Sequence, residues 1–464
     1  MIPEPDYETL KKKEFEKKEA KKMSGKMTQY RWWVMAFIFV IYTIANADRA
    51  NIGFALPYIR KEFAMSNTEA GAIISLFFAG YSIGQIPSGF LIRKFGMRSM
   101  FSMGMLLTSI FTGLLGFAGN AFHFKALRLL IGLAESPVVV GCTTTINQWF
   151  PPKEKGTATG MFLAGSKLGP LIVPPICAWI ILTFGWREIF IAFMIPGVLL
   201  SVFWYIMVNN KPEESRFVSQ KEVEYIHSSE NVAMEKKNTE KKSEYKLWWL
   251  DKIVRAKKVE PLVNSKQIFR SWDIYGAAMG YFFMVGIVSV LMSWLPSYLV
   301  NVKQFAIMKT AFVSASPFAG TVVGNFLGGW VSDRFLNKRR KPLMMVTALS
   351  TTIMMYSLVY APADAYLLAL LLFGTGFLLS VGYSAFAVYP MGRTTKEAYP
   401  VAWGIVNTGG QLGGTCFPLI VGMILDKFNW DVVFASLAFG SFICLLIVST
   451  IIEPVEDPLE KPHS

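Results

Sequence analysis

The sequence predicts an all-α integral membrane protein with twelve transmembrane helices arranged as two six-helix bundles. Of its 464 residues, 53% are hydrophobic and only 17% are charged, whereas an ordinary soluble chain is about a quarter charged. A soluble domain of this composition would expose too much apolar surface to water. The composition therefore argues against a single globular enzyme or a nucleic-acid-binding module and favours a chain solvated by lipid.

The spanning helices are predicted from runs of about 20 mostly apolar residues, the length that crosses a bilayer. The first and fourth runs are long enough to tilt or to extend beyond the bilayer. The twelve predicted spans cover residues 32–59, 67–92, 98–119, 122–147, 157–183, 186–208, 271–300, 308–333, 342–361, 364–390, 399–425 and 430–452.

Positive charge divides between the two sides of these spans very unevenly. Of the 46 lysines and arginines, 36 fall in the two tails and the loops of one side, 7 in the alternate loops and 3 within spans. The positive-inside rule then places both termini in the cytoplasm. We therefore expect a multi-pass protein of the cell membrane, and the net charge of +14 reflects topology, so no nucleic-acid partner is expected.

The same pattern divides the chain into five parts. Two six-helix bundles, 32–208 and 271–452, are flanked by cytoplasmic tails, 1–31 and 453–464, and joined by a cytoplasmic central loop, 209–270. This loop is rich in lysine and glutamate, and its stretch 229–246 has the composition of a solvated linker.

The end of the central loop has a different composition. The stretch from Leu247 to Val259 is compatible with an amphipathic helix on the inner leaflet, with Trp248, Trp249 and Ile253 as its apolar face. An incidental role for this stretch is favoured over a regulatory one.

No metal or organic cofactor is predicted. The four cysteines lie inside apolar spans without the spacing of metal ligands, and the three histidines lie at a helix start or in polar segments. Protons are the only coupling ion expected.

An internal repeat links the two halves. The loop after the second span contains Gly89, Arg93, Gly96 and Arg98, and the loop after the eighth contains Gly329, Asp333 and Arg334. Simple cytoplasmic anchoring by cations would also explain the charges, but the two glycines occupy equivalent places in the two halves. The 6+6 layout and the G-x-x-x-D-R loop resemble the major facilitator superfamily over residues 32–452. Arg93 stands where that family usually carries an acid, so the ion pair attributed to that acid is not expected in the first half.

Further motifs narrow this resemblance. They are Asn46–Gly53 in the first span, Gly80–Gly89 in the second, Arg128–Pro137 in the fourth, followed by Asn147–Pro151, and Gly404–Gly414 in the eleventh. Together they resemble the anion:cation symporter family, which includes the galactonate, hexuronate and glucarate permeases. The vesicular glutamate branch of this family usually has a histidine where this chain has Ile74, which argues against that branch. The resemblance implies a monomeric carrier, not an enzyme, that moves a small organic anion together with protons by alternating access. A sugar acid (an aldonate, uronate or aldarate) is the expected substrate.

Ionisable side chains inside a bilayer are costly and are functional candidates by default. The first half has five, Asp48, Arg49, Arg128, Glu135 and Lys167, whereas none is predicted near mid-membrane in the second half. The expected ion pair is Asp48 with Arg128. Glu135 then becomes the less compensated acid, able to hold the transported proton. The predicted proton-coupling residues are thus Asp48 and Glu135, although a purely structural ion-pair network is the alternative.

Neutral polar groups at helical spacing complete the predicted site. Tyr81 and Gln85 share one helix face, as do Asn407 and Gln411, and interhelical hydrogen bonding is the alternative role for each pair. The predicted substrate-binding residues are Arg49, Tyr81, Arg128, Ser166, Lys167, Tyr383, Ser384 and Asn407.

Two other functions stay open at this stage. One is an exchanger of organic phosphates or dicarboxylates that uses Arg49 and Arg128 as an anion clamp, for which buried acids would be less necessary. The other is a transporter-like membrane sensor that signals through its central loop. A membrane enzyme is disfavoured because no nucleophile elbow, phosphate loop or metal-ligand cluster is present in the sequence.

Overall fold

The computed structural model describes residues 27–232, 248–336, 339–395 and 397–455. It contains twelve helical spans long and apolar enough to cross a membrane, which confirms the predicted fold class. The spanning helices are α2 (Tyr30–Glu62), α3 (Asn67–Phe95), α4 (Met97–Leu115), α5 (Ala121–Trp149), α6 (Pro152–Thr183), α7 (Arg187–Met207), α11 (Trp272–Asn301), α12 (Ile307–Arg334), α13 (Lys341–Ser357), α14 (Ala365–Val381) with α15 (Tyr383–Arg393), α16 (Tyr399–Lys427) and α17 (Trp430–Thr450).

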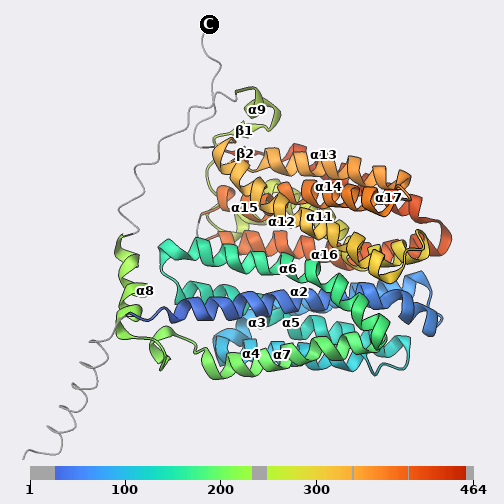
Figure 1. The fold of residues 1–464 in the computed structure, drawn as a ribbon. Coiled ribbons are helices and arrows are strands. Elements are labelled where there is room, and N and C mark those ends of the chain that lie inside the picture. The colour runs from blue at the N-terminus through green and yellow to red at the C-terminus, as the bar shows by residue number, and fades with distance from the viewer. Residues whose placement is uncertain (1–26, 233–247, 337–338, 396, 456–464) are drawn as a thin grey trace, which may run out of the picture.

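The helices form two bundles that lie side by side along their length (Figure 1). In bundle 1 (α2–α7), α3 packs on α5, α4 on α5 and α7, and α2 on α6. In bundle 2 (α11–α17), the corresponding pairs are α12 with α14, α11 with α16, and α13 with α17. The bundles meet through α3 and α16, α6 and α12, and α2 and α11. We call the end where α2 begins and α17 ends the terminal end, and the other the opposite end.

The tenth span is a broken helix, which differs from the single run predicted over 364–390. α14 ends at Val381 and α15 begins at Tyr383, with Gly382 between them. The Gly382 N–H donates to Thr347 Oγ1 at 2.6 Å, and a Cβ at Gly382 would overlap the Leu343 carbonyl. A break within the membrane must have its backbone groups satisfied by neighbouring helices, and Thr347 on α13 does this here.

The opposite end is closed by a cap that crosses from one bundle to the other. Asp426, in the last turn of α16, accepts hydrogen bonds from the backbone N–H of Asn67 and Thr68, both at 2.8 Å. These are the first N–H groups of α3, which have no partner within their own helix. At this end the backbones also touch directly, since a Cβ at Gly53, Gly71 or Gly422 would overlap the other bundle.

The terminal end is arranged differently. Here four of the six helices that line the bundle interface (α3, α6, α12 and α16) carry glycines around which a Cβ would meet nothing within 4 Å, namely Gly89, Gly156, Gly160, Gly329 and Gly404. The backbones of the two bundles therefore meet closely at the opposite end, whereas these glycines of the terminal end face open space.

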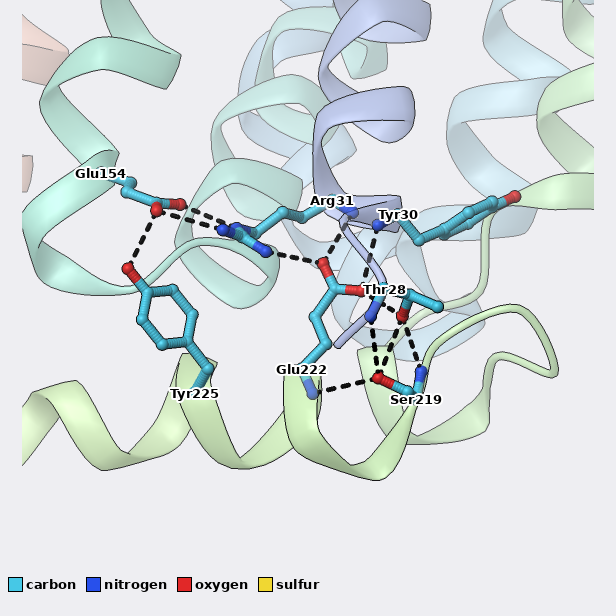
Figure 2. Close-up of polar contacts among 7 residues, drawn as sticks. All are labelled: Thr28, Tyr30, Arg31, Glu154, Ser219, Glu222 and Tyr225. Carbon is cyan, nitrogen blue, oxygen red and sulfur yellow. Dashed lines mark hydrogen bonds and ion pairs between the residues drawn. The ribbon is translucent and has the colours of Figure 1, made fainter. Parts of the chain in front are cut away.

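A short helix of the central loop, α8 (Gln220–Val232), fastens onto the terminal end of bundle 1 (Figures 1 and 2). Its Glu222 is fully buried. The Glu222 carboxylate accepts from the backbone N–H of Tyr30 at 3.0 Å and of Arg31 at 3.1 Å, and it pairs with Arg31 Nη1 at 2.9 Å. Arg31 also pairs with Glu154 of α6 at 2.8 Å. The loop helix thus ties together the first turns of α2 and α6.

Replacing Glu222 by alanine is expected to lower the stability of bundle 1 by about 3–5 kcal/mol, because it leaves Arg31 and two backbone donors buried without this partner. Thermal unfolding of the purified protein measures the effect. The matched control is Glu213→Ala, which removes a half-exposed pair with His227 in the same loop and is expected to cost at most about 1 kcal/mol. Equal losses in the two variants would contradict the structural role of Glu222.

The second half of the central loop attaches to bundle 2 instead. In α9 (Trp248–Ile253), Asp251 forms a buried ion pair with Arg339 at 2.6 Å. Strand β1 (Ala256–Lys257) then pairs in parallel with β2 (Glu453–Pro454). Glu453 accepts the N–H groups of Arg340 and Lys341, and burial raises the pKa of this carboxyl.

The structure differs from the predicted amphipathic helix over 247–259, because the observed helix is shorter and is followed by strand β1. The helix ends at Ile253, and Asp251 anchors it to protein. Leu247 and the side chains of Trp248 and Trp249 lie outside the described residues, as does most of the predicted linker 229–246. Residues 229–232 belong to α8.

Candidate functional site

The five charged side chains predicted inside the spans all lie well within long helices. Asp48 and Arg49 are on α2, Arg128 and Glu135 on α5, and Lys167 on α6. Three of them, Asp48, Arg128 and Glu135, are at most 2% exposed. Arg49 retains 14% exposure of its side chain, so it is the more exposed of the two arginines, although its Nη2 atom is buried.

The ion pair of this cluster joins Arg49 to Glu135, not Arg128 to Asp48. Arg49 Nη2 lies 2.6 Å and Nε 2.7 Å from Glu135 Oε1. The other carboxylate oxygen, Oε2, is buried without a hydrogen bond. The predicted pairing was therefore wrong, since Glu135 is the compensated acid and Asp48 is the less compensated one.

Asp48 and Arg128 are both buried with little direct compensation. Among the described residues, Asp48 has no ion pair within 4 Å, its Oδ2 has no hydrogen bond, and Asn51 contacts Oδ1 at 3.4 Å. Arg128 Nε has no hydrogen-bond partner, and the guanidinium stacks over Phe77 with its carbon 4.7 Å from the ring centre. Burial of charges that lack direct partners is costly, which marks these two residues as candidates for a change of partner during function.

Aromatic rings surround the cations. Arg49 lies over Tyr81 at 4.7 Å, and Lys167 lies over Tyr383 at 4.8 Å, which joins α6 of bundle 1 to α15 of bundle 2. The Tyr281 hydroxyl donates to the Tyr383 hydroxyl at 3.3 Å. Tyr281 was not predicted from the sequence. It is one of three tyrosines in the very apolar α11, and their spacing gives no signal that separates a site residue from a packing residue.

The neutral predicted residues divide into two groups. Asn407 Nδ2 donates to Gln85 Oε1 at 2.8 Å. This bond, those of Asp426 and the bond from Asn67 Nδ2 to the Leu425 carbonyl are the hydrogen bonds that join bundle 1 to bundle 2 within the described part of the chain. Ser166, by contrast, donates to Leu163 in its own helix at 2.6 Å, so its hydroxyl is partly engaged. Ser384 is half-buried, and its hydroxyl makes no hydrogen bond among the described residues.

Two polar groups near these residues are buried without a hydrogen bond, Ser380 Oγ and Gln411 Oε1. Together with Asn407, Tyr81 and the Tyr281–Tyr383 pair, they provide donors and acceptors suited to a solute that carries hydroxyl groups. No cluster of three or more potential metal ligands occurs among the residues that the structure describes.

The loop motif of the first half is anchored within bundle 1. Gly96 joins α3 to α4 with φ +84°, a conformation that favours glycine. The Arg98 N–H donates to Asn210 at 2.9 Å, and its Nε donates to the Tyr205 carbonyl at 2.6 Å. For Arg93, no ion pair is found in the described part of the chain.

In the second half, Gly329 lies in open space and the Arg334 guanidinium carbon lies 5.7 Å from the centre of the Trp330 ring. The side chain of Asp333 is outside the described residues. A gating role for either loop stays a prediction.

Known proteins are similar to this chain in sequence and in fold. The chain is 28% identical over 431 residues to a probable galactarate/D-glucarate transporter of Bacillus subtilis, covering 89% of this chain and 90% of the relative. It is 26% identical over 417 residues to a D-galactonate transporter of Escherichia coli, with 88% and 92% covered. A crystal structure of a D-xylose–proton symporter aligns with TM-score 0.69 at 16% identity, covering 92% of this chain and 99% of that one.

A second solved structure, a bacterial homologue of the human lysosomal transporter Spinster, aligns with TM-score 0.70 at 15% identity, with 91% and 95% covered. A family model for the Major Facilitator Superfamily matches residues 38–374 and 309–464, nearly the whole span-forming region. Together with the twelve spans, these matches identify the chain as a multi-pass membrane transporter that belongs to the Major Facilitator Superfamily.

Proposed function

We propose that this chain is a proton-coupled symporter of a sugar acid. The observation that carries the proposal is the Arg49–Glu135 ion pair, which is the direct ion pair of the buried cluster and involves its most exposed guanidinium. A substrate carboxylate can bind Arg49 only in competition with Glu135. Protonation of Glu135 removes that competitor, so binding of the anion and uptake of a proton favour each other.

The surrounding groups suit the remainder of a sugar acid. The hydroxyls of Tyr81, Tyr281 and Tyr383 and the amide of Asn407 can exchange hydrogen bonds with substrate hydroxyls. The relatives named as galactarate, glucarate and galactonate transporters support the same substrate class. Since a single chain supplies residues from both bundles, the proposed working unit is the monomer.

Alternating access would use the asymmetry between the two ends. With the termini in the cytoplasm, as the charge distribution predicts, the open terminal end would face inward and the Asp426 cap would close the outside. Transport would then require the cap to break while the terminal-end glycines come together. This orientation and cycle are part of the proposal.

Uptake into proteoliposomes containing only this protein tests the proposal. An inward-directed pH gradient (acid outside) is expected to drive accumulation of radiolabelled D-glucarate or D-galactonate above the external concentration, and a protonophore should abolish it. An exchanger of organic anions would instead show uptake that depends on preloaded anion and not on the gradient. Absence of uptake under both conditions would favour a sensor.

A further inference from the structure

We infer that Lys167 binds a second anionic group of the substrate, so that this carrier selects doubly charged sugar acids over singly charged ones. The inference rests on the proposed sugar-acid function and makes it more specific. Lys167 lies at the interface of the bundles, with its ammonium 4.8 Å from the centre of the Tyr383 ring across that interface. No carboxylate lies within ion-pair distance of it among the described residues.

Lys167 is too far from either end of its helix to place its charge in bulk water. It is 15 residues from the start of α6 at Pro152 and 16 from its end at Thr183. At 1.5 Å per residue, about 22 Å of helix lies on each side. A lysine side chain that extends toward the membrane surface shortens such a distance by only a few ångströms, at about 1.3 Å per side-chain bond. Its charge must therefore be accommodated inside the protein.

The charges of the cluster indicate what compensates it. The buried cations are Arg49, Arg128 and Lys167, and the buried acids are Asp48 and Glu135. When one of the two acids holds the coupled proton, three positive charges face one negative charge. A substrate with one carboxylate would leave one cation uncompensated, whereas a substrate with two would balance the site. This result does not depend on which acid takes the proton.

The positions of the cations fit an elongated diacid. Arg49 lies over the Tyr81 ring and Lys167 lies over the Tyr383 ring, at 4.7 and 4.8 Å from the ring centres. The two cations belong to different helices of bundle 1, α2 and α6, and each contacts a tyrosine ring. A six-carbon diacid could place one carboxylate at Arg49 and the other at Lys167, with its hydroxyls toward Tyr383 and Tyr281. The contact with the Tyr383 ring holds the ammonium in place until the stronger ion pair forms.

The test compares binding of diacids and monoacids with the same carbon skeleton. D-glucarate and galactarate carry two carboxylates, and D-gluconate and D-galactonate carry one. The purified wild-type protein is expected to bind the diacids at least about tenfold more tightly, the contribution of one charge-assisted hydrogen bond. Lys167→Met should reduce diacid affinity to the monoacid level, while monoacid affinity changes less than about twofold. Lys167→Arg should retain the preference for diacids.

Controls separate a failure of the inference from a failure of the proposed function. Lys309→Met removes another lysine that lies over an aromatic ring, here Phe305, and should change neither affinity. Unchanged monoacid binding by Lys167→Met also shows that the variant is folded. If the wild type binds both classes equally, or if Lys167→Met keeps the preference or weakens both classes alike, the inference is wrong and the sugar-acid function stands. If the wild type binds none of the four acids, both are wrong.

Discussion

Replacing Arg49 by lysine is expected to weaken binding of any sugar acid by about 100-fold, although the positive charge is kept. Arg49 contacts Glu135 through two nitrogens, Nε and Nη2, at 2.7 and 2.6 Å. A planar guanidinium presents its donors in a fixed fork that matches a carboxylate, whereas a lysine ammonium is a point charge that cannot copy this geometry. The Arg49 guanidinium also lies over the Tyr81 ring. A compact ammonium group cannot stack on the ring in the way a planar guanidinium does.

Equilibrium binding of D-glucarate and D-galactonate to the purified variant measures this effect. Arg187→Lys is the matched control, because Arg187 forms a similar 2.6 Å ion pair with Glu62, but at a half-exposed position on the opposite end. We expect binding by that control to stay at the wild-type level. If Arg49→Lys bound either acid with near wild-type affinity, Arg49 would not contact the substrate carboxylate, and Arg128 would become the better candidate.

The spans and their division into two bundles could be predicted from the sequence because both depend on local properties. An apolar run of about 20 residues has few alternatives to a spanning helix. Some residues of the candidate site could also be predicted. A charged side chain within an apolar run is costly whichever face of the helix carries it, so it is a functional candidate. Asp48, Arg49, Arg128, Glu135 and Lys167 were found in this way.

The partners within the site could not be predicted from the sequence. Asp48 and Arg49 are adjacent, so their side chains point about 100° apart around α2. Which of them reaches α5 depends on how α2 is rotated about its axis and on its distance from α5. Hydrophobic periodicity does not fix that rotation for α2, because most of its circumference is buried by other helices. The observed rotation directs Arg49 to Glu135.

Contacts between residues far apart in the sequence could not be predicted either. The buried position of Glu222 depends on three segments, α2, α6 and α8, that meet only in the folded chain. In a Lys- and Glu-rich loop, such a residue has the same local signature as a solvated charge. The break at Gly382 gave a weak signal, because glycine in an apolar run more often permits close helix packing.

The Glu135→Gln variant is expected to separate substrate exchange from proton-driven accumulation. Glutamine fills the same space, and its amide oxygen can still accept from Arg49, but it carries no charge to compete with the substrate carboxylate. The variant is thus fixed in a state that resembles the protonated carrier. Counterflow of D-glucarate between two pools should persist, while accumulation driven by a pH gradient should disappear, because the carrier no longer gains or loses the proton as it turns.

Asp48→Asn is the comparison that the observed pairing makes informative. If Asp48 formed an ion pair with Arg128, its loss would leave an isolated buried arginine, and counterflow would decline as well. Since no such pair is present among the described residues, we expect the asparagine variant to keep counterflow and near wild-type stability and to show only reduced accumulation. Both assays use the same proteoliposomes, so protein content and orientation cancel. If Glu135→Gln accumulated substrate at the wild-type level, proton coupling through Glu135 would have to be abandoned in favour of Asp48.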